Sequence, residues 1–142
     1  MNEQNYGLVW EEKFETGCEK VDEQHRRMFE LVGNLIKACT QGYDKDILND
    51  TLDFLVVYAI RHFKDEEKLQ QQYSYPGYQA HKLMHEDFKL TVTAMVSTFK
   101  AGGSSEDLSS SVNKLVVRWL VNHIQREDKK IGDHIRSLEA TP

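Results

Sequence analysis

Two short histidine-containing segments stand near the middle of the sequence. His62 lies four residues before Glu66, and His81 lies four residues before His85. Residues four positions apart lie on the same face of an α-helix, one turn from each other. The segments are separated by Tyr75-Pro76-Gly77, and a short Pro/Gly break of this kind predicts a helical hairpin. Such a hairpin brings three imidazoles and a carboxylate into one volume, which is typical of a metal site.

Four segments are expected to form the helices that position these residues. Apolar residues recur at spacings of three and four over residues 22–42, 44–72, 77–100 and 107–128. Short connections between four amphipathic helices predict an all-α fold, an antiparallel up-down-up-down four-helix bundle. We expect one domain over residues 1–142, with an N-terminal arm at 1–21, the bundle at 22–128 and a C-terminal extension at 129–142. The large apolar residues of the arm, Trp10 and Phe14 among them, should pack on the bundle.

Five of the six histidines and two carboxylates fall on the apolar faces of the predicted helices. Leaving such polar groups unpaired in a core costs about 1–3 kcal/mol each, and more for carboxylates. A metal site would satisfy all of them. Asp128 follows His123 by five residues, about 140° around an ideal helix, so the helix must be distorted there for both to point inward. The seven candidate ligands are His25, His62, Glu66, His81, His85, His123 and Asp128.

The number of candidate ligands indicates two ions. Five imidazoles and two carboxylates exceed the four ligands of a tetrahedral zinc site, and a mixed nitrogen and oxygen set favours iron or manganese. If Glu66 and Asp128 both bridge, together with one solvent oxygen, the histidines divide three and two. One ion is then saturated and the other keeps an open position. His81 and His85 share a helical face, so they are expected to bind the same ion. Asp65, Glu67 and Lys68, beside Glu66, look like a solvated face.

Taken together, these motifs resemble the hemerythrins, in particular the bacterial ones, over essentially the whole chain. The residues that carry the resemblance are DEQH ending at His25, HFKDE at 62–66, YPGYQAHKLMH at 75–85 and WLVNHIQRED at 119–128. The resemblance implies a non-haem centre of two iron ions (Fe2+/Fe3+), bridged by Glu66, Asp128 and an oxo or hydroxo group. It also implies that His81, His85 and His123 hold the saturated iron, and that His25 and His62 hold the open one.

The resemblance further implies an apolar O2 pocket. Leu120 and Trp119 precede His123 by about one turn, so we expect them to cover the pocket without touching the ligands. The sixth histidine, His134, matches no ligand position and is expected at the surface. The implied pocket residues are Met28, Phe63, Trp119, Leu120 and Ile124.

The function expected from the resemblance is reversible O2 binding for oxygen storage, delivery or sensing, not enzymatic catalysis. Azide and nitric oxide are possible alternative ligands. The alternative is a di-iron oxidase, peroxidase or nitric oxide reductase. Carboxylate-rich bundles of that kind carry Glu-x-x-His on two helices, and this sequence has no Glu-x-x-His. A signalling input domain would need a second domain, and an iron-repair protein would usually have more cysteines near its N-terminus than Cys18.

The composition bounds partners and compartment. The net charge is −5 and there is no long basic run, so no nucleic-acid partner is expected. The longest apolar stretches are far shorter than the ~20 residues of a membrane span, and the first residues lack the pattern of a secretory signal. Cys18 and Cys39 lie near opposite ends of one predicted helix and are expected to be free thiols. We therefore expect a cytoplasmic protein without a membrane partner.

Overall fold

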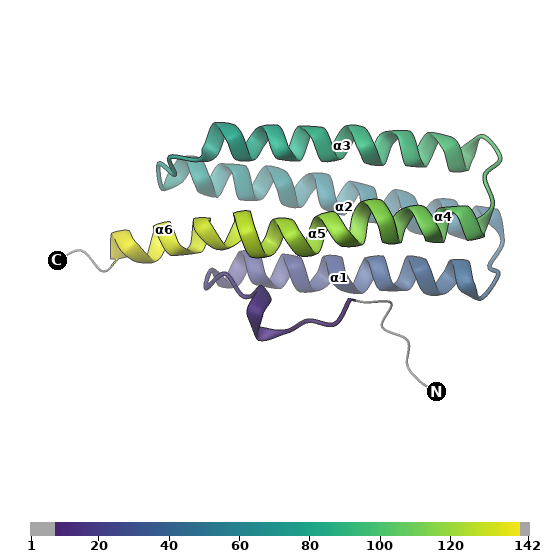
Figure 1. Ribbon diagram of the computed structural model, residues 1–142, viewed down its shortest axis with the longest axis horizontal. Helices are drawn as coiled ribbons and strands as arrows, with labels where there is room; N and C mark the ends of the chain where they lie inside the picture. Colours follow the sequence, from purple (N-terminus) through teal and green to yellow (C-terminus); the bar gives the residue numbers. More distant parts are fainter. Residues whose placement is uncertain (1–7, 140–142) are drawn as a thin grey trace.

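Four long helical rods lie side by side and alternate in direction along the chain (Figure 1). The computed structural model describes residues 8–139, and contains no strand among them. The first three rods are α1 (Glu19–Thr40), α2 (Lys45–Gln72) and α3 (Tyr78–Lys100). The fourth rod is a continuous run of α4 (Ser105–Ser111), η2 (Val112–Val117), α5 (Arg118–His123), η3 (Ile124–Asp128) and α6 (Lys129–Glu139). The predicted all-α, antiparallel four-helix bundle is confirmed.

A side-chain cap stands at the start of α2 and of α4. Asp44 accepts a hydrogen bond from the backbone N–H of Ile47 at 3.0 Å, which caps α2 where the sequence predicted its start. Ser104 caps α4 in the same way, accepting from the N–H of Asp107 at 3.0 Å. The prediction that the first helix begins near Asp22 is three residues late, because α1 begins at Glu19.

Asp22 instead holds the segment that leads into α1. Its buried carboxylate accepts hydrogen bonds from the backbone N–H of Thr16 at 2.8 Å and of Gly17 at 3.2 Å. Aspartate is common as a helix cap because its carboxylate accepts hydrogen bonds from backbone N–H groups. The residue type of Asp22 alone therefore could not show whether it caps α1 or holds the preceding segment.

The fourth rod contains two stretches of π-helix, in which the backbone hydrogen bonds join residues five positions apart. The second stretch, Ile124–Asp128, directly follows His123. Its wider turn carries Asp128 round to the inward face, so the distortion predicted from the spacing of five is confirmed. The first stretch, Val112–Val117, was not predicted.

The fourth rod does not end at Asp128. It continues as α6, which buries Ile131 and Ile135. The segment 129–139, expected as a C-terminal extension, is therefore about three more turns of the same rod. Residues 140–142 of the expected extension lie outside the described residues.

An N-terminal arm packs along the bundle before α1 begins, beside α1 in Figure 1. Phe14, in the short helix η1 (Glu12–Phe14), is buried, and its ring centroid lies 5.1 Å from that of Phe29 in α1. Trp10 lies 5.2 Å from the same ring. The expected packing of the arm is confirmed for the described residues, and residues 1–7 of the arm lie outside them. In the part of the chain that the structure describes, no helix is both long and apolar enough to cross a membrane.

Candidate metal centre

A buried polar cluster lies in the bundle at the end that carries the α2–α3 turn. Each of its side chains is at most 5% exposed. The first rod supplies one residue, and each of the other three supplies two, so that all four converge on the same volume. The cluster contains all seven candidate ligands: His25, His62, Glu66, His81, His85, His123 and Asp128.

The seven residues form two overlapping groups, within each of which the potential ligand atoms lie within 4.8 Å of one another. We call His81, His85 and His123 with the two carboxylates the three-histidine group. We call His25 and His62 with the same carboxylates the two-histidine group. Glu66 and Asp128 belong to both groups. This division matches the three-and-two division expected from the sequence.

Glu66 turns one carboxylate oxygen toward each group. Its Oε1 lies 3.0 Å from Nε2 of His81 and 3.2 Å from Nε2 of His85. Its Oε2 lies 3.5 Å from Nε2 of His62 and 3.6 Å from Nε2 of His25. The carboxylate is therefore placed between the two groups, in the position that a bridging ligand would take.

Asp128 is arranged in the same way from the opposite rod. Its Oδ1 lies 3.0 Å from Nε2 of His81 and 3.1 Å from Nε2 of His123. Its Oδ2 lies 2.9 Å from Nε2 of His25. The π-helical turn before Asp128 is what allows this carboxylate and His123 to face the same volume.

The hydrogen bonding of the cluster is incomplete without a cation. Nε2 of His25, Nε2 of His85, Oε2 of Glu66 and Oδ1 of Asp128 are buried without a hydrogen bond of acceptable geometry. Nε2 of His81 and Nε2 of His123 lie 3.1 Å apart and can share one proton between them. A cation placed beside them would instead accept both lone pairs. Converging imidazole nitrogens and carboxylate oxygens, with no thiolate, suit iron. The residues present therefore fit a di-iron centre.

The outer nitrogens of two imidazoles are held by polar side chains. Nδ1 of His62 donates to Oε1 of Gln24 at 2.6 Å, and Gln24 in turn donates to Asp65 at 3.0 Å. Nδ1 of His85 donates to Glu67 at 2.8 Å. These bonds orient each ring with Nε2 directed into the cluster, as is usual for metal-binding histidines.

These hydrogen bonds to the outer imidazole nitrogens were not predicted from the sequence. Asp65 and Glu67 were expected on a solvated face, but Glu67 contacts an imidazole directly and Asp65 does so through Gln24. The usable signal was chemical: a metal-binding histidine needs an acceptor at its second nitrogen, and acidic residues flank Glu66 on both sides.

Aromatic rings cover the three-histidine group. Trp119 stacks on His123, with ring centroids 4.2 Å apart and planes 12° apart, and Phe63 stacks on His85 at 4.0 Å. Phe88 stacks on Trp119 in turn, with ring centroids 3.9 Å apart. Phe88 was not among the pocket residues expected from the sequence. The expectation that Trp119 would not touch the candidate ligands is therefore wrong. The other residues predicted for the O2 pocket, Met28, Leu120 and Ile124, are buried in the core.

The carboxylates and imidazoles of the cluster shift one another's pKa values. Burial lowers the pKa of His25, but the nearby carboxylates of Asp128 and Glu66, with oxygens 2.9 Å and 3.6 Å from its Nε2, outweigh burial and raise that pKa to about 9. The same opposition raises the pKa of His81 to about 10. Burial would raise the pKa of Glu66, yet the surrounding imidazoles hold it well below its usual range. Two buried carboxylates thus demand positive charge, which protons supply in the metal-free protein and cations would supply in their place.

His134 belongs to neither group. Its Nε2 donates to the carbonyl of Tyr73 at 2.8 Å, and its ring packs edge-on against Tyr75 at 5.6 Å. It is half-buried and ties α6 to the α2–α3 turn. The expectation that it is not part of the cluster agrees with this position. It is partly exposed, as expected of a surface residue, but it also makes these two specific contacts.

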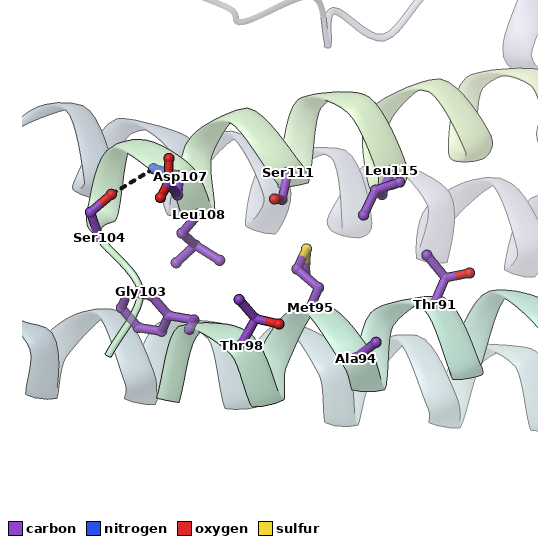
Figure 2. Close-up of a pocket in the computed structure, with 11 residues that line it drawn as sticks. Thr91, Ala94, Met95, Thr98, Gly103, Ser104, Asp107, Leu108, Ser111 and Leu115 are labelled. Carbon is purple, nitrogen blue, oxygen red and sulfur yellow. Dashed lines mark hydrogen bonds between the residues drawn. The ribbon is translucent and has the colours of Figure 1, made fainter. Parts of the chain in front are cut away.

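Of two pockets in the bundle, one adjoins the cluster and the other does not. A polar pocket between α1 and α2 reaches Glu66 and is lined by Lys20, Gln24, Asp65 and Lys68 among others. A separate cavity of about 400 Å3 lies between α3 and the α4–η2 part of the fourth rod (Figure 2). It is lined by Met95 and residues around the α3–α4 turn, and none of the seven cluster residues lines it.

An antiparallel four-helix bundle whose core presents five imidazoles to two shared carboxylates defines a class of two-metal helical proteins. Comparison with known proteins identifies the class more closely. The model of the family described as Hemerythrin HHE cation binding domain matches residues 16–135. The chain belongs to the hemerythrin family.

Individual relatives agree with this assignment. Bacteriohemerythrin of Stenotrophomonas maltophilia (strain R551-3) is 34% identical over 130 residues, which cover 92% of this chain and 82% of the relative. Myohemerythrin of Theromyzon tessulatum is 35% identical over 121 residues, covering 85% and 88%. The crystal structure of wild-type hemerythrin superposes with a TM-score of 0.79 at 30% identity, covering 90% of this chain and 97% of that chain. Hemerythrins are O2-binding proteins with a non-haem di-iron centre, and the clustered residues of this chain could ligate such a centre.

Proposed function

We propose that this protein binds O2 reversibly at a di-iron centre held by the seven clustered residues, and that it stores, delivers or senses oxygen. The observation that carries the proposal is the placement of Glu66 and Asp128, each of which turns one oxygen toward each histidine group. Two iron ions bridged by these carboxylates and an oxo or hydroxo group would supply the reversible redox chemistry that O2 binding requires.

The unequal groups support one binding position for a small ligand. The three-histidine group offers five protein ligands and the two-histidine group offers four. A site with fewer protein ligands keeps room for an exogenous one, so His25 and His62 mark the side where O2, azide or nitric oxide would bind. The stacked rings of Phe63, Trp119 and Phe88 lie against the imidazoles and would help to exclude water from the centre.

The arrangement favours a binding protein over an enzyme. Gln24 and Glu67, which contact the cluster from outside, are already engaged by imidazole N–H groups. No further carboxylate or histidine joins the two groups among the described residues. The side chains at hand therefore orient ligands and exclude water, and they supply no separate acid or base to a substrate.

A second candidate is a di-iron enzyme, an oxidase, peroxidase or nitric oxide reductase. The observation that favours it is the polar pocket between α1 and α2, of which Glu66 is a lining residue although its own side chain is buried. Water and protons that reach a reduced centre would promote the loss of bound O2 as peroxide.

One experiment separates the two candidates. The iron-loaded protein is reduced without oxygen, and its visible spectrum is recorded before O2 is added, after addition and after removal of O2. We expect an O2-dependent spectrum that disappears when O2 is removed, with little peroxide. Sustained peroxide formation over many turnovers with a reductant would reject the oxygen-binding role in favour of an oxidase.

We also propose that residues 1–142 act as one hemerythrin-like domain located in the cytoplasm. The family match over residues 16–135 supports the single domain. Cys18 and Cys39 are both free and lie at opposite ends of α1, which suits a reducing compartment. Fractionation of cells that express the chain, with detection of the protein in each fraction, tests this location.

A further inference from the structure

The outward face of α2, opposite the candidate ligands, carries an apolar ridge. Phe54, Val57 and Ile60 are 54%, 64% and 44% exposed, and they follow one another at spacings of three. Large apolar side chains scattered singly on a surface are ordinary, but three in a row along one helix form a continuous contact surface. Nothing in the described part of the chain covers this ridge.

Charged residues continue the same face on both sides of Val57, and they do so symmetrically. Positions four, seven and eleven residues before Val57 are acidic, and positions four, seven and eleven residues after it are basic. These offsets are the ones that return to one face of an α-helix. All six side chains are exposed: Asp46, Asp50, Asp53, Arg61, Lys64 and Lys68.

We propose that two copies of this chain associate through α2, packed antiparallel about a two-fold axis that passes beside Val57. A two-fold axis at this position brings each residue to the level of the one equally far beyond Val57 in the other copy. Val57 meets Val57 of the partner subunit, and Phe54 lies at the level of Ile60 of the partner subunit. Asp50 then lies at the level of Lys64 of the partner subunit, and Asp46 at the level of Lys68 of the partner subunit.

The antiparallel direction follows from the charges. A parallel pair in register would place acidic residues beside acidic ones and basic residues beside basic ones, whereas the antiparallel pair opposes unlike charges along the whole contact. The charge pattern of α2 is therefore complementary to that of a second, antiparallel α2. A heterologous partner would require no such symmetry.

The contact is small, and this sets its expected strength. One helix against one helix buries less than the ~1,200 Å2 of a standard stable interface, so the dimer is weak and reversible. Exposed ion pairs contribute little each and are screened by salt. Asp53 already pairs with Lys100 of its own chain at 3.0 Å, so its share of the pairing across the dimer is reduced. Because the candidate ligands face inward from the same helix, the partner subunit would not contact them, although Lys68 also lines the polar pocket beside Glu66.

The first test is the oligomeric state of the iron-loaded full chain, measured by sedimentation equilibrium over a concentration series at low and high salt. We expect the mass to rise from 16.5 kDa toward twice that value with concentration, less so at high salt. Val57→Lys places two like charges at the axis and should abolish the rise. Leu83→Lys removes an equally exposed leucine of α3, 66% exposed, adds the same charge elsewhere and should leave the rise unchanged.

The second test is a charge exchange that fixes the register. Asp50→Lys and Lys64→Asp should each weaken association by about tenfold, because each creates like-charged neighbours across the axis. The double variant restores opposite charges and should recover association. Circular dichroism and iron content verify that each variant is folded. A mass that stays at one chain at every concentration, association that survives Val57→Lys, or a double variant no better than the single ones would each overturn the proposal. The outcome is independent of the proposed O2 binding.

Discussion

Glu67 accepts a hydrogen bond from Nδ1 of His85 at 2.8 Å, on the side of the imidazole that points away from the cluster. Nε2 of the same ring lies 3.2 Å from Glu66. Two adjacent acidic residues of α2 therefore flank the two ring nitrogens of one imidazole, and only Glu67 is hydrogen-bonded to it. The outer bond fixes the tautomer that leaves Nε2 free for a metal ion.

Removing that outer bond should weaken metal binding. Glu67→Ala is expected to lower iron affinity by about 10–100-fold, and Glu67→Gln, which keeps an acceptor oxygen, by less. Iron affinity is measured by competition with a chelator. Glu86→Ala, which removes an exposed glutamate that pairs with Lys89, is the control and should change nothing. Equal affinity of Glu67→Ala and wild type would contradict an orienting role for Glu67.

Because Glu66 belongs to both histidine groups, its substitution should lose more iron than substitution of a residue that belongs to one group. Glu66→Ala removes an oxygen from both groups and should abolish binding of both ions, whereas His62→Ala affects only the two-histidine group and should leave about one iron per chain. The measurement is iron per chain by metal analysis. His134→Ala, outside both groups, should retain full iron. If His134→Ala instead loses half the iron, the proposed ligand set is incorrect.

Metal removal should destabilise the fold. Without a cation, buried atoms such as Nε2 of His85 and Oε2 of Glu66 lack hydrogen bonds, and each unmet group costs about 1–3 kcal/mol. Chelation should therefore lower the melting temperature by many degrees, and adding iron back should restore it. Thermal unfolding followed by circular dichroism provides the measurement. Identical melting temperatures of the metal-free and iron-loaded protein would show that the seven residues do not form one metal site.

Leu120 is expected to protect the oxygenated state. It is buried and precedes His123 by about one turn, so Leu120→Ala should admit water near the cluster and speed the decay of the oxygenated spectrum. The same substitution costs about 2–5 kcal/mol of stability through the cavity it leaves. Leu52→Ala, at a fully buried position of α2 distant from the cluster, is the matched control: it should lose similar stability without faster decay. Equal decay rates in the two variants would refute the protective role.

Gly132 lies where the arm packs closely on α6, and Gly33 in α1 serves as a control. A methyl group at Gly132 would overlap the carbonyl oxygen of Thr16, whereas one at Gly33 would meet nothing within 4 Å. Gly132→Ala should therefore lower the free energy of unfolding by about 1–3 kcal/mol. Gly33→Ala, inside α1, should raise it by about 0.5–1 kcal/mol. Urea unfolding measures the free energy of unfolding of both variants. A stabilising effect of Gly132→Ala would show that the arm can move to accommodate the added methyl group.

Much of the fold could be predicted because the apolar periodicity, the breaks at Pro76-Gly77 and Gly102-Gly103, and the cap at Asp44 all agree. The start of α1 was missed because Asp22 suits a helix cap by residue type, and only the tertiary position of Thr16 shows its other role. The end of the fourth rod was missed because residues 129–142 carry many charges, and only the tertiary structure shows that Ile131 and Ile135 are buried.

The candidate site was predictable to a similar degree. The seven residues could be grouped because polar side chains on apolar helical faces need partners, and the spacing of five between His123 and Asp128 already required a helical distortion. Their role as iron ligands stays a prediction. The need for acceptors at the outer imidazole nitrogens could be predicted, but not that Glu67 and Gln24 supply them, because this depends on the rotation of neighbouring helices about their axes.

The two ends of the bundle are fastened to different degrees. At the end with the cluster, α6 holds the α2–α3 turn through His134 and Tyr73, and it holds the arm through Arg136, which donates to the carbonyl of Thr16 at 2.6 Å. At the opposite end, the α1–α2 and α3–α4 turns are largely exposed, and an exposed hydrogen bond from Nζ of Lys45 to the carbonyl of Gly103 joins them at 2.5 Å. Both turns lie at the other end of the bundle from the α2–α3 turn (Figure 1). Changes in chain length through insertion or deletion are therefore better tolerated in these two turns, where added residues would lengthen a loop without moving any member of the cluster.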